Sequence, residues 1–258
     1  MTHRISGLVE IAAQFDAMLI DQFGVIHDGQ KLYPGAAEVL AELHRLKIPV
    51  VVMTNSGKRA AHNTLRVVNM GIAREDFVDC VSSGEVAFQS LTVKKAFLIG
   101  KQGEDYGFAP IEFVEDAIDA EVMLILGSNA PATSLDDYRR QLAKIRLPAI
   151  CCNPDKQMLT PTGLQPAPGA IADLYQSLGG EVTWIGKPYP GIYHHALKLL
   201  GHPGRVLCIG DSAEHDVAGG RGAGLSTLLV QQGVSADVPE AEIHPCPDYV
   251  MSSFVWGG

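Results

Sequence analysis

The chain has 258 residues, 47% of them hydrophobic and 19% charged, and its formal net charge is −9. This length and composition are typical of a globular protein with one large domain or two modest ones and enough apolar residues for a buried core. The acidic balance argues against nucleic acid or an anionic membrane as the main partner, although local positive charge and a metal still allow a small phosphorylated substrate.

The first part of the chain alternates short apolar runs with amphipathic segments. The apolar run 17–20 predicts a buried strand, which ends at Asp21 before a turn marked by glycines. Apolar residues at helical spacing follow over 36–47, and a second buried strand is expected over 48–53, ended by the polar run 54–56. Strand, helix and strand with continuous apolar strands predict a parallel sheet that is covered on both faces.

The middle of the chain repeats this alternation without a catalytic constellation of its own. A capping-box pattern at 82–85 begins a helix, and strands are expected over 94–100 and 148–155. Residues 168–180 predict a helix that glycines close. We interpret residues 82–181 as an inserted, smaller α/β domain.

The first pattern then resumes. A short strand pattern leads into Lys187, and the apolar run 205–210 predicts another buried strand that ends at Asp211. We therefore expect an α/β fold with a doubly wound, Rossmann-like parallel sheet. Its core would be formed by residues 1–81 and 182–258, and the inserted α/β domain would be a cap.

Polar residues stand at four strand ends, and their types suit one kind of chemistry. The strand ends carry Asp21, Thr54 with Asn55, Lys187, and Asp211 with Asp216 five residues further on. Open α/β sheets place their sites at the carboxyl ends of the strands. A carboxylate there can attack phosphorus and form an aspartyl-phosphate that water later cleaves. Because negative charge builds on the phosphoryl oxygens, such a site needs a compact cation and aligned donors.

The same residues could meet that need. Oxygen ligands from Asp21 and Asp211, completed by water, suit Mg²⁺. Lys187 offers a positive charge, and Thr54 with its neighbouring amides at a helix start offers hydrogen bonds. The sequence therefore predicts phosphoryl chemistry at this edge of the sheet.

Four segments in order resemble the motifs of a known superfamily. They are DQFGV, MTNSGKR, IGKPYPGIY and GDSAEHD, and they resemble the four motifs of the haloacid dehalogenase-like (HAD) superfamily. The Asn153-Pro154-Asp155 turn, the SSGE segment and the long insertion between the second and third motifs resemble its NagD-like subfamily, a group dominated by small-molecule phosphatases with a large α/β cap.

The resemblance implies a role for each matching residue. Asp21 would be the nucleophile, Thr54 would bind the phosphoryl group, and Lys187 would neutralise it. Asn55 and Ser56, next along the motif, are expected to contact the substrate.

The resemblance also implies a Mg²⁺ site. Its ligands would be the carboxylates of Asp21 and Asp211 and the backbone carbonyl of Phe23, and Asp216 would support the metal shell.

One position departs from the family pattern. The family's phosphatases usually have a second Asp two residues after the nucleophile, as general acid and then base, and here that residue is Phe23. Such assistance is typically worth ~10²–10⁴ in rate, and an alcohol leaving group would suffer most from its loss. His27 and Asp28 are conceivable substitutes, but the favoured interpretation is that both sit in the turn and face solvent or the cap.

The resulting hypothesis is a Mg²⁺-dependent phosphatase that acts on a small phosphorylated metabolite through an aspartyl-phosphate, with turnover that Phe23 could weaken. Two alternatives stay open: a phospholigand-binding or regulatory protein with little turnover, and a phosphotransferase. The sequence does not name the substrate. Family analogy offers a homodimer through the cap, and the oligomeric state stays open.

The location is inferred from what the sequence lacks. The five cysteines include no C-x-x-C pair, which indicates free thiols in a reducing compartment. The first fifteen residues lack the continuous apolar core of a signal peptide, and no apolar run approaches the length of a membrane span. We expect a cytoplasmic protein without a membrane partner.

Overall fold

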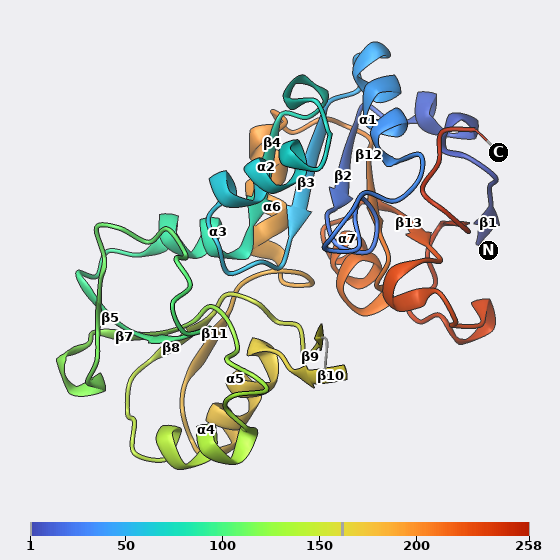
Figure 1. Cartoon of the computed structure of the whole chain (residues 1–258). Helices are drawn as coiled ribbons and strands as arrows, with labels where there is room; N and C mark the ends of the chain where they lie inside the picture. Colours follow the sequence, from blue (N-terminus) through green and yellow to red (C-terminus); the bar gives the residue numbers. More distant parts are fainter. Residues whose placement is uncertain (1, 161–162, 258) are drawn as a thin grey trace. The chain divides into compact units, whose positions relative to one another are not determined.

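The computed structural model describes residues 2–160 and 163–257 (Figure 1). The described residues form two compact units. The core unit draws on Met1–Thr54, Asn63–Val81 and Lys187–Gly258, and the insert unit draws on Asn55–His62 and Ser82–Gly186. Among the described residues, no helix is both long enough and apolar enough to cross a membrane.

The core unit contains a seven-stranded sheet with the order β1-β14-β13-β12-β2-β3-β4 (Figure 1). Its strands are β1 (His3–Arg4), β2 (Ala17–Asp21), β3 (Val50–Thr54), β4 (Asp79–Ser82), β12 (Val206–Gly210), β13 (Ser226–Val230) and β14 (Tyr249–Met251). Strand β2 pairs in parallel with β12 on one side and with β3 on the other. The predicted α/β fold class with a parallel sheet is confirmed.

The strands are parallel and apolar because the sheet is buried on both faces. Every residue of β2, β3 and β12 is buried, so their side chains do not alternate between apolar and polar. From β2 the chain continues to β3 and β4 on one side, whereas β12, β13 and β14 lie on the other side. The carboxyl ends of β2, β3 and β12 therefore meet where the strand order reverses, which is where open α/β sheets bind ligands.

Helices complete the core unit. They are α1 (Ala36–Arg45), α2 (Ala60–Asn69, which belongs to this unit from Asn63 on), α6 (Pro190–Leu199), α7 (Ala218–Gly222) and the π-helix η5 (Ala213–Val217), with short 3-10 helices η1 (Leu8–Glu10), η2 (Ala12–Gln14), η3 (Arg74–Asp76), η6 (Gly233–Ser235) and η7 (Glu240–Glu242). Helix α1 shows why they form: its apolar residues recur at helical spacing, and Val39, Leu40 and Leu43 are fully buried in the core.

The insert unit has its own parallel sheet of five strands, in the order β11-β8-β7-β5-β6 (Figure 1). These strands are β5 (Lys95–Ile99), β6 (Glu112–Val114), β7 (Val122–Ile125), β8 (Ala149–Cys151) and β11 (Val182–Trp184). Its helices are α3 (Ser83–Ser90), α4 (Leu135–Leu142), α5 (Pro168–Ser177) and the 3-10 helix η4 (Ala117–Asp119). The Ser82 side chain accepts a hydrogen bond from the amide of Glu85, so the predicted cap of α3 forms.

Two features of the insert unit were not predicted. An antiparallel pair, β9 (Gln157–Thr160) with β10 (Gly163–Pro166), follows β8. Residues 55–62 also belong to this unit. A bidentate ion pair joins them to α3: Nε and Nη2 of Arg59 lie 2.6 and 3.0 Å from the carboxylate oxygens of Glu85. That the segment 82–181 acts as a cap stays a prediction.

A buried tyrosine hydroxyl gives a stability prediction for the insert unit. Tyr175 is 1% exposed; its hydroxyl donates to the Leu147 carbonyl (2.7 Å) and accepts from the Leu147 amide (3.1 Å). Tyr175→Phe should lower the free energy of unfolding by about 1–3 kcal/mol in urea titrations, because it strips two backbone groups of their partner. In the control Tyr249→Phe, the lost hydroxyl lies 3.4 Å from Oε1 of Gln14 on the surface, and we expect less than about 0.5 kcal/mol. Equal losses in both variants would contradict this account.

Candidate functional site

The turn after β2 is fixed by backbone hydrogen bonds. The amides of Ile26 and His27 donate to the carbonyl of Gln22 (3.0 and 3.2 Å), and the amide of Gly24 donates to the carbonyl of His27 (2.9 Å). Gly24 has a φ of +91°, and a Cβ there would lie 2.1 Å from Oδ2 of Asp211. Only glycine fits, so the turn and the end of β12 can lie in direct contact.

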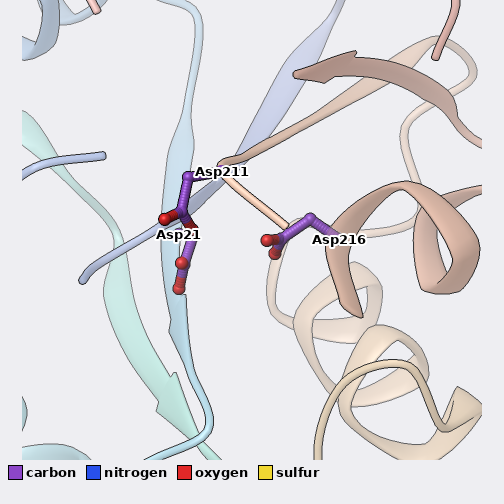
Figure 2. A group of neighbouring side chains, drawn as sticks. All are labelled: Asp21, Asp211 and Asp216. Carbon is purple, nitrogen blue, oxygen red and sulfur yellow. The ribbon is translucent and has the colours of Figure 1, made fainter. Parts of the chain in front are cut away.

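Three buried carboxylates converge at these strand ends. Asp21, Asp211 and Asp216 each offer an oxygen, and the three oxygens lie within 4.8 Å of one another. Figure 2 shows Asp216 directing its carboxyl group toward those of Asp21 and Asp211. Nζ of Lys187 lies 2.6 Å from Oδ1 of Asp21 and 2.7 Å from Oδ1 of Asp216, so one ammonium bridges two carboxylates.

The charges in this group are out of balance. Burial raises the pKa of Asp21 well above its usual range, and although Lys187 opposes this, the other two carboxylates reinforce it. Burial and the charge of Asp216 raise the pKa of Asp211 to about 7. Burial alone would lower the pKa of Lys187, but Asp21 and Asp216 together hold it raised. Three carboxylates thus face one ammonium in a dry environment.

A divalent cation fits this donor set. Carboxylate oxygens are the ligands that Mg²⁺ prefers, and a charge of +2 would balance what Lys187 leaves uncompensated. Asp216 differs from the other two, because its Oδ1 accepts from Lys187 and its Oδ2 accepts from the amide of Ser212 (3.1 Å). Both oxygens of Asp216 thus already accept hydrogen bonds, so this carboxylate is better suited to orienting its neighbours than to coordinating a cation directly.

Thr54 and Phe23 both belong to the core unit. Asp21 pairs with Met53 in the sheet, so Thr54, which ends β3 and is buried, follows one residue beyond that pair. Phe23 lies in the turn after β2 with its side chain 48% exposed. Its ring carries no proton to transfer, as the sequence indicates.

Asn55 and Ser56 belong to the insert unit. Nδ2 of Asn55 donates to Oδ1 of Asp155 (2.9 Å), and Oδ1 of Asn55 lies 3.4 Å from the donating hydroxyl of Ser83. The Asn55 side chain therefore has partners within its own unit. Its role in substrate binding stays a prediction, and the backbone amide is the group best suited to it.

His27 differs from the favoured interpretation of the sequence, in which it faces solvent or the cap. It is fully buried, its Nδ1 accepts from the amide of Gly29 (2.9 Å), and its ring meets that of Phe23 edge-on with 5.8 Å between centroids. The turn folds back over the imidazole, which a local pattern does not reveal. Asp28 does sit in the turn, where its carboxylate accepts from the amides of Gln30 and Lys31 (both 2.9 Å).

Val234 and Ser235 also contact this site, and no sequence motif indicates them. The amide of Val234 donates to Oδ2 of Asp211 (2.7 Å), and the hydroxyl of Ser235 donates to the Asp211 carbonyl (2.5 Å). The only local signal is Gly233, which marks a turn after β13 without indicating what the turn contacts.

Comparisons with known families agree with this geometry. A family model described as haloacid dehalogenase-like hydrolase matches residues 18–109, and a second, described as HAD-hydrolase-like, matches residues 184–256. The first match contains Asp21, and the second contains Asp211 and Asp216. The chain belongs to the haloacid dehalogenase-like hydrolases, and the predicted superfamily is confirmed.

Individual relatives indicate which kind of hydrolase the chain is. A dihydroxyacetone phosphatase of Corynebacterium glutamicum is 28% identical over 91% of this chain and 88% of its own length. The crystal structure of a haloacid dehalogenase-like hydrolase from Brucella suis matches with a TM-score of 0.87 at 26% identity, over 97% of this chain and all of the other. NagD of Escherichia coli shares the fold, with a TM-score of 0.69 at 23% identity over 93% of this chain and 96% of its own. The chain is a phosphoric monoester hydrolase of this family.

The buried histidine gives a prediction on pH. Burial and the charge of Arg66 lower the pKa of His27 from 6.5 to about 4, although Asp28 opposes this. Between these values the unfolded chain binds more protons, so the free energy of unfolding should fall as the pH drops, by at most about 2 kcal/mol from pH 7 to pH 5.

The measurement is urea unfolding at both pH values, compared with His27→Asn, whose side-chain oxygen can accept from Gly29 as Nδ1 does. The variant should lose less stability than the wild type on acidification. Identical pH dependence in the two proteins would show that His27 does not contribute.

Proposed function

We propose that the chain is a Mg²⁺-dependent phosphatase of a small phosphorylated metabolite, and that Asp21 forms a covalent phospho-intermediate. The observation that carries the proposal is the buried group of Asp21, Asp211 and Asp216 around the ammonium of Lys187, with donor oxygens within 4.8 Å. Asp21, Asp211 and the carbonyl of Phe23 would hold the metal, which when bound supplies positive charge for the phosphoryl oxygens.

The nucleophile must be ionised to react. Burial disfavours the carboxylate form of Asp21, and Lys187 counteracts this from 2.6 Å. Oδ1 of Asp21 also accepts from the amide of Gln22 (2.8 Å), so that oxygen is held in place by two donors. The pair of donors orients the carboxylate, which favours attack along a fixed direction.

The reaction would proceed in two displacements. A carboxylate oxygen of Asp21 forms a bond to phosphorus while the bond from phosphorus to the ester oxygen breaks, and the leaving alkoxide takes up a proton from solvent water. Water then attacks phosphorus, the bond between phosphorus and the Asp21 oxygen breaks, and the water's proton passes to solvent or stays on the phosphate, so that inorganic phosphate leaves and the Asp21 carboxylate is restored. Lys187 and Thr54 would bind the phosphoryl oxygens in both steps.

Phe23 determines which substrates react well. An alcohol leaves with difficulty unless a group donates a proton to it, and the exposed Phe23 ring cannot do this. A phenolate or a carboxylate leaves readily without such help. Because Phe23 cannot act as a general acid or base, two alternatives also fit the chain. One is a protein that binds a phospholigand with little turnover, and the other is a phosphotransferase with a long-lived aspartyl-phosphate.

A similar phosphatase and the cysteine content support the substrate class and the location. The dihydroxyacetone phosphatase similar to this chain supports a small phosphorylated metabolite as substrate. We infer that the insert unit acts as a cap domain and that a homodimer through it is the oligomer to test. Five free cysteines, four of them buried, support a reducing cytoplasmic location.

The first test removes the nucleophile. Asp21→Asn should abolish Mg²⁺-dependent hydrolysis of an aryl phosphate, by at least ~10³-fold, because an amide does not displace a phosphoester. Asp16→Asn is the matched control, since Asp16 lies just before the opposite end of β2 in an exposed ion pair with Arg205. Turnover that survives in Asp21→Asn would refute the covalent mechanism, and absence of turnover in the wild type across a broad phosphate panel would favour the binding protein.

The second test restores the missing acid. Phe23→Asp should raise kcat on alkyl phosphates by up to ~10²–10⁴, and it should raise kcat on aryl phosphates much less. Phe23→Asn has the shape of the aspartate without its titratable proton and serves as the control. A similar gain in both variants would show that the Phe23 ring hinders the substrate sterically.

A further inference from the structure

A short segment after β13 contacts both loops that carry the proposed metal ligands. It comprises Gln232–Ser235, includes the 3-10 turn η6, and matches none of the four motifs found in the sequence. None of its side chains is a carboxylate or an imidazole, so it supplies no obvious ligand. Its contacts indicate another task.

The segment holds Asp211 by both its side chain and its backbone. The Val234 amide donates to Oδ2 (2.7 Å), and the hydroxyl of Ser235, a residue only 5% exposed, donates to the carbonyl of Asp211 (2.5 Å). One bond fixes the rotation of the carboxylate, and the other fixes the backbone from which the carboxylate projects. Together they set where the carboxylate points.

The same segment holds the turn after the nucleophile. Nε2 of Gln232 donates to the carbonyl of Val25 (3.0 Å), and its Oε1 accepts from the amide of Phe254 (3.4 Å). At Gly233 (φ +57°) a Cβ would lie 1.9 Å from Oδ2 of Asp211 and 2.8 Å from Cα of Gly24. Two glycines therefore let this segment, the turn and Asp211 touch one another.

We infer that Gln232–Ser235 is a positioning segment for the metal site. It aligns Asp211 through Val234 and Ser235, and it aligns the turn that includes the Phe23 carbonyl through Gln232. The inference rests on the proposed function, because it assumes that these groups bind Mg²⁺. Outer partners that orient ligands typically change metal affinity by ~10–100-fold when they are removed.

The test measures Mg²⁺ binding itself, by isothermal titration calorimetry without substrate. Ser235→Ala should weaken Mg²⁺ binding by ~10–100-fold, and Ser235→Thr, which keeps the hydroxyl, should restore most of the affinity. Ser252→Ala is the control, because Ser252 is exposed and accepts only a surface hydrogen bond from Arg4 (3.2 Å) among the bonds described for it. Gln232→Met tests the second arm independently and should also weaken Mg²⁺ binding.

Thermal unfolding separates positioning from general stability. In Ser235→Ala, the increase in Tm that Mg²⁺ produces should shrink, whatever the Tm of the metal-free protein. Wild-type affinity in both Ser235→Ala and Gln232→Met would overturn the inference while leaving the proposed function intact. A wild-type protein that binds no Mg²⁺ would overturn the inference together with the metal requirement of the proposed function.

Discussion

The buried ammonium of Lys187 between Asp21 and Asp216 is the interaction on which the site depends. Two contacts of 2.6 and 2.7 Å hold together side chains from segments almost two hundred residues apart. Buried ions are costly to desolvate, and such a pair is weak evidence of stability by itself. Here three carboxylates exceed one ammonium, and the cation proposed above would balance the excess negative charge.

The sheet provides the frame for this charge. Strands β2 and β12 are neighbours in parallel, with Ile20 opposite Ile209, so Asp21, the last residue of β2, lies close to Asp211, the first residue after β12. Glycine at positions 24 and 233 removes the side chains that would keep the loops apart. The strands thus set the approximate position of each carboxylate, and hydrogen bonds from the loops orient it.

Much of this could be predicted from the sequence, because the signals are local. Apolar runs ending in Asp21 and Asp211 indicate buried parallel strands with acidic ends, and ordered motifs place Lys187 with them. What the sequence did not indicate depends on how loops fold back or meet in space. The burial of His27 requires the turn to fold back on itself, and the hydrogen bond from Ser235 to Asp211 joins two loops that no motif connects.

The pairing of β2 with β12 also has a consequence for biosynthesis. A nascent chain that has emerged as far as residue 186 contains all of the insert unit but only one of the three converging carboxylates. Its strand β2 still lacks the neighbour that will cover one edge. During translation that hydrophobic edge stays open to mispairing or to a chaperone until β12 (Val206–Gly210) leaves the ribosome, so the group of three carboxylates is among the last features to form.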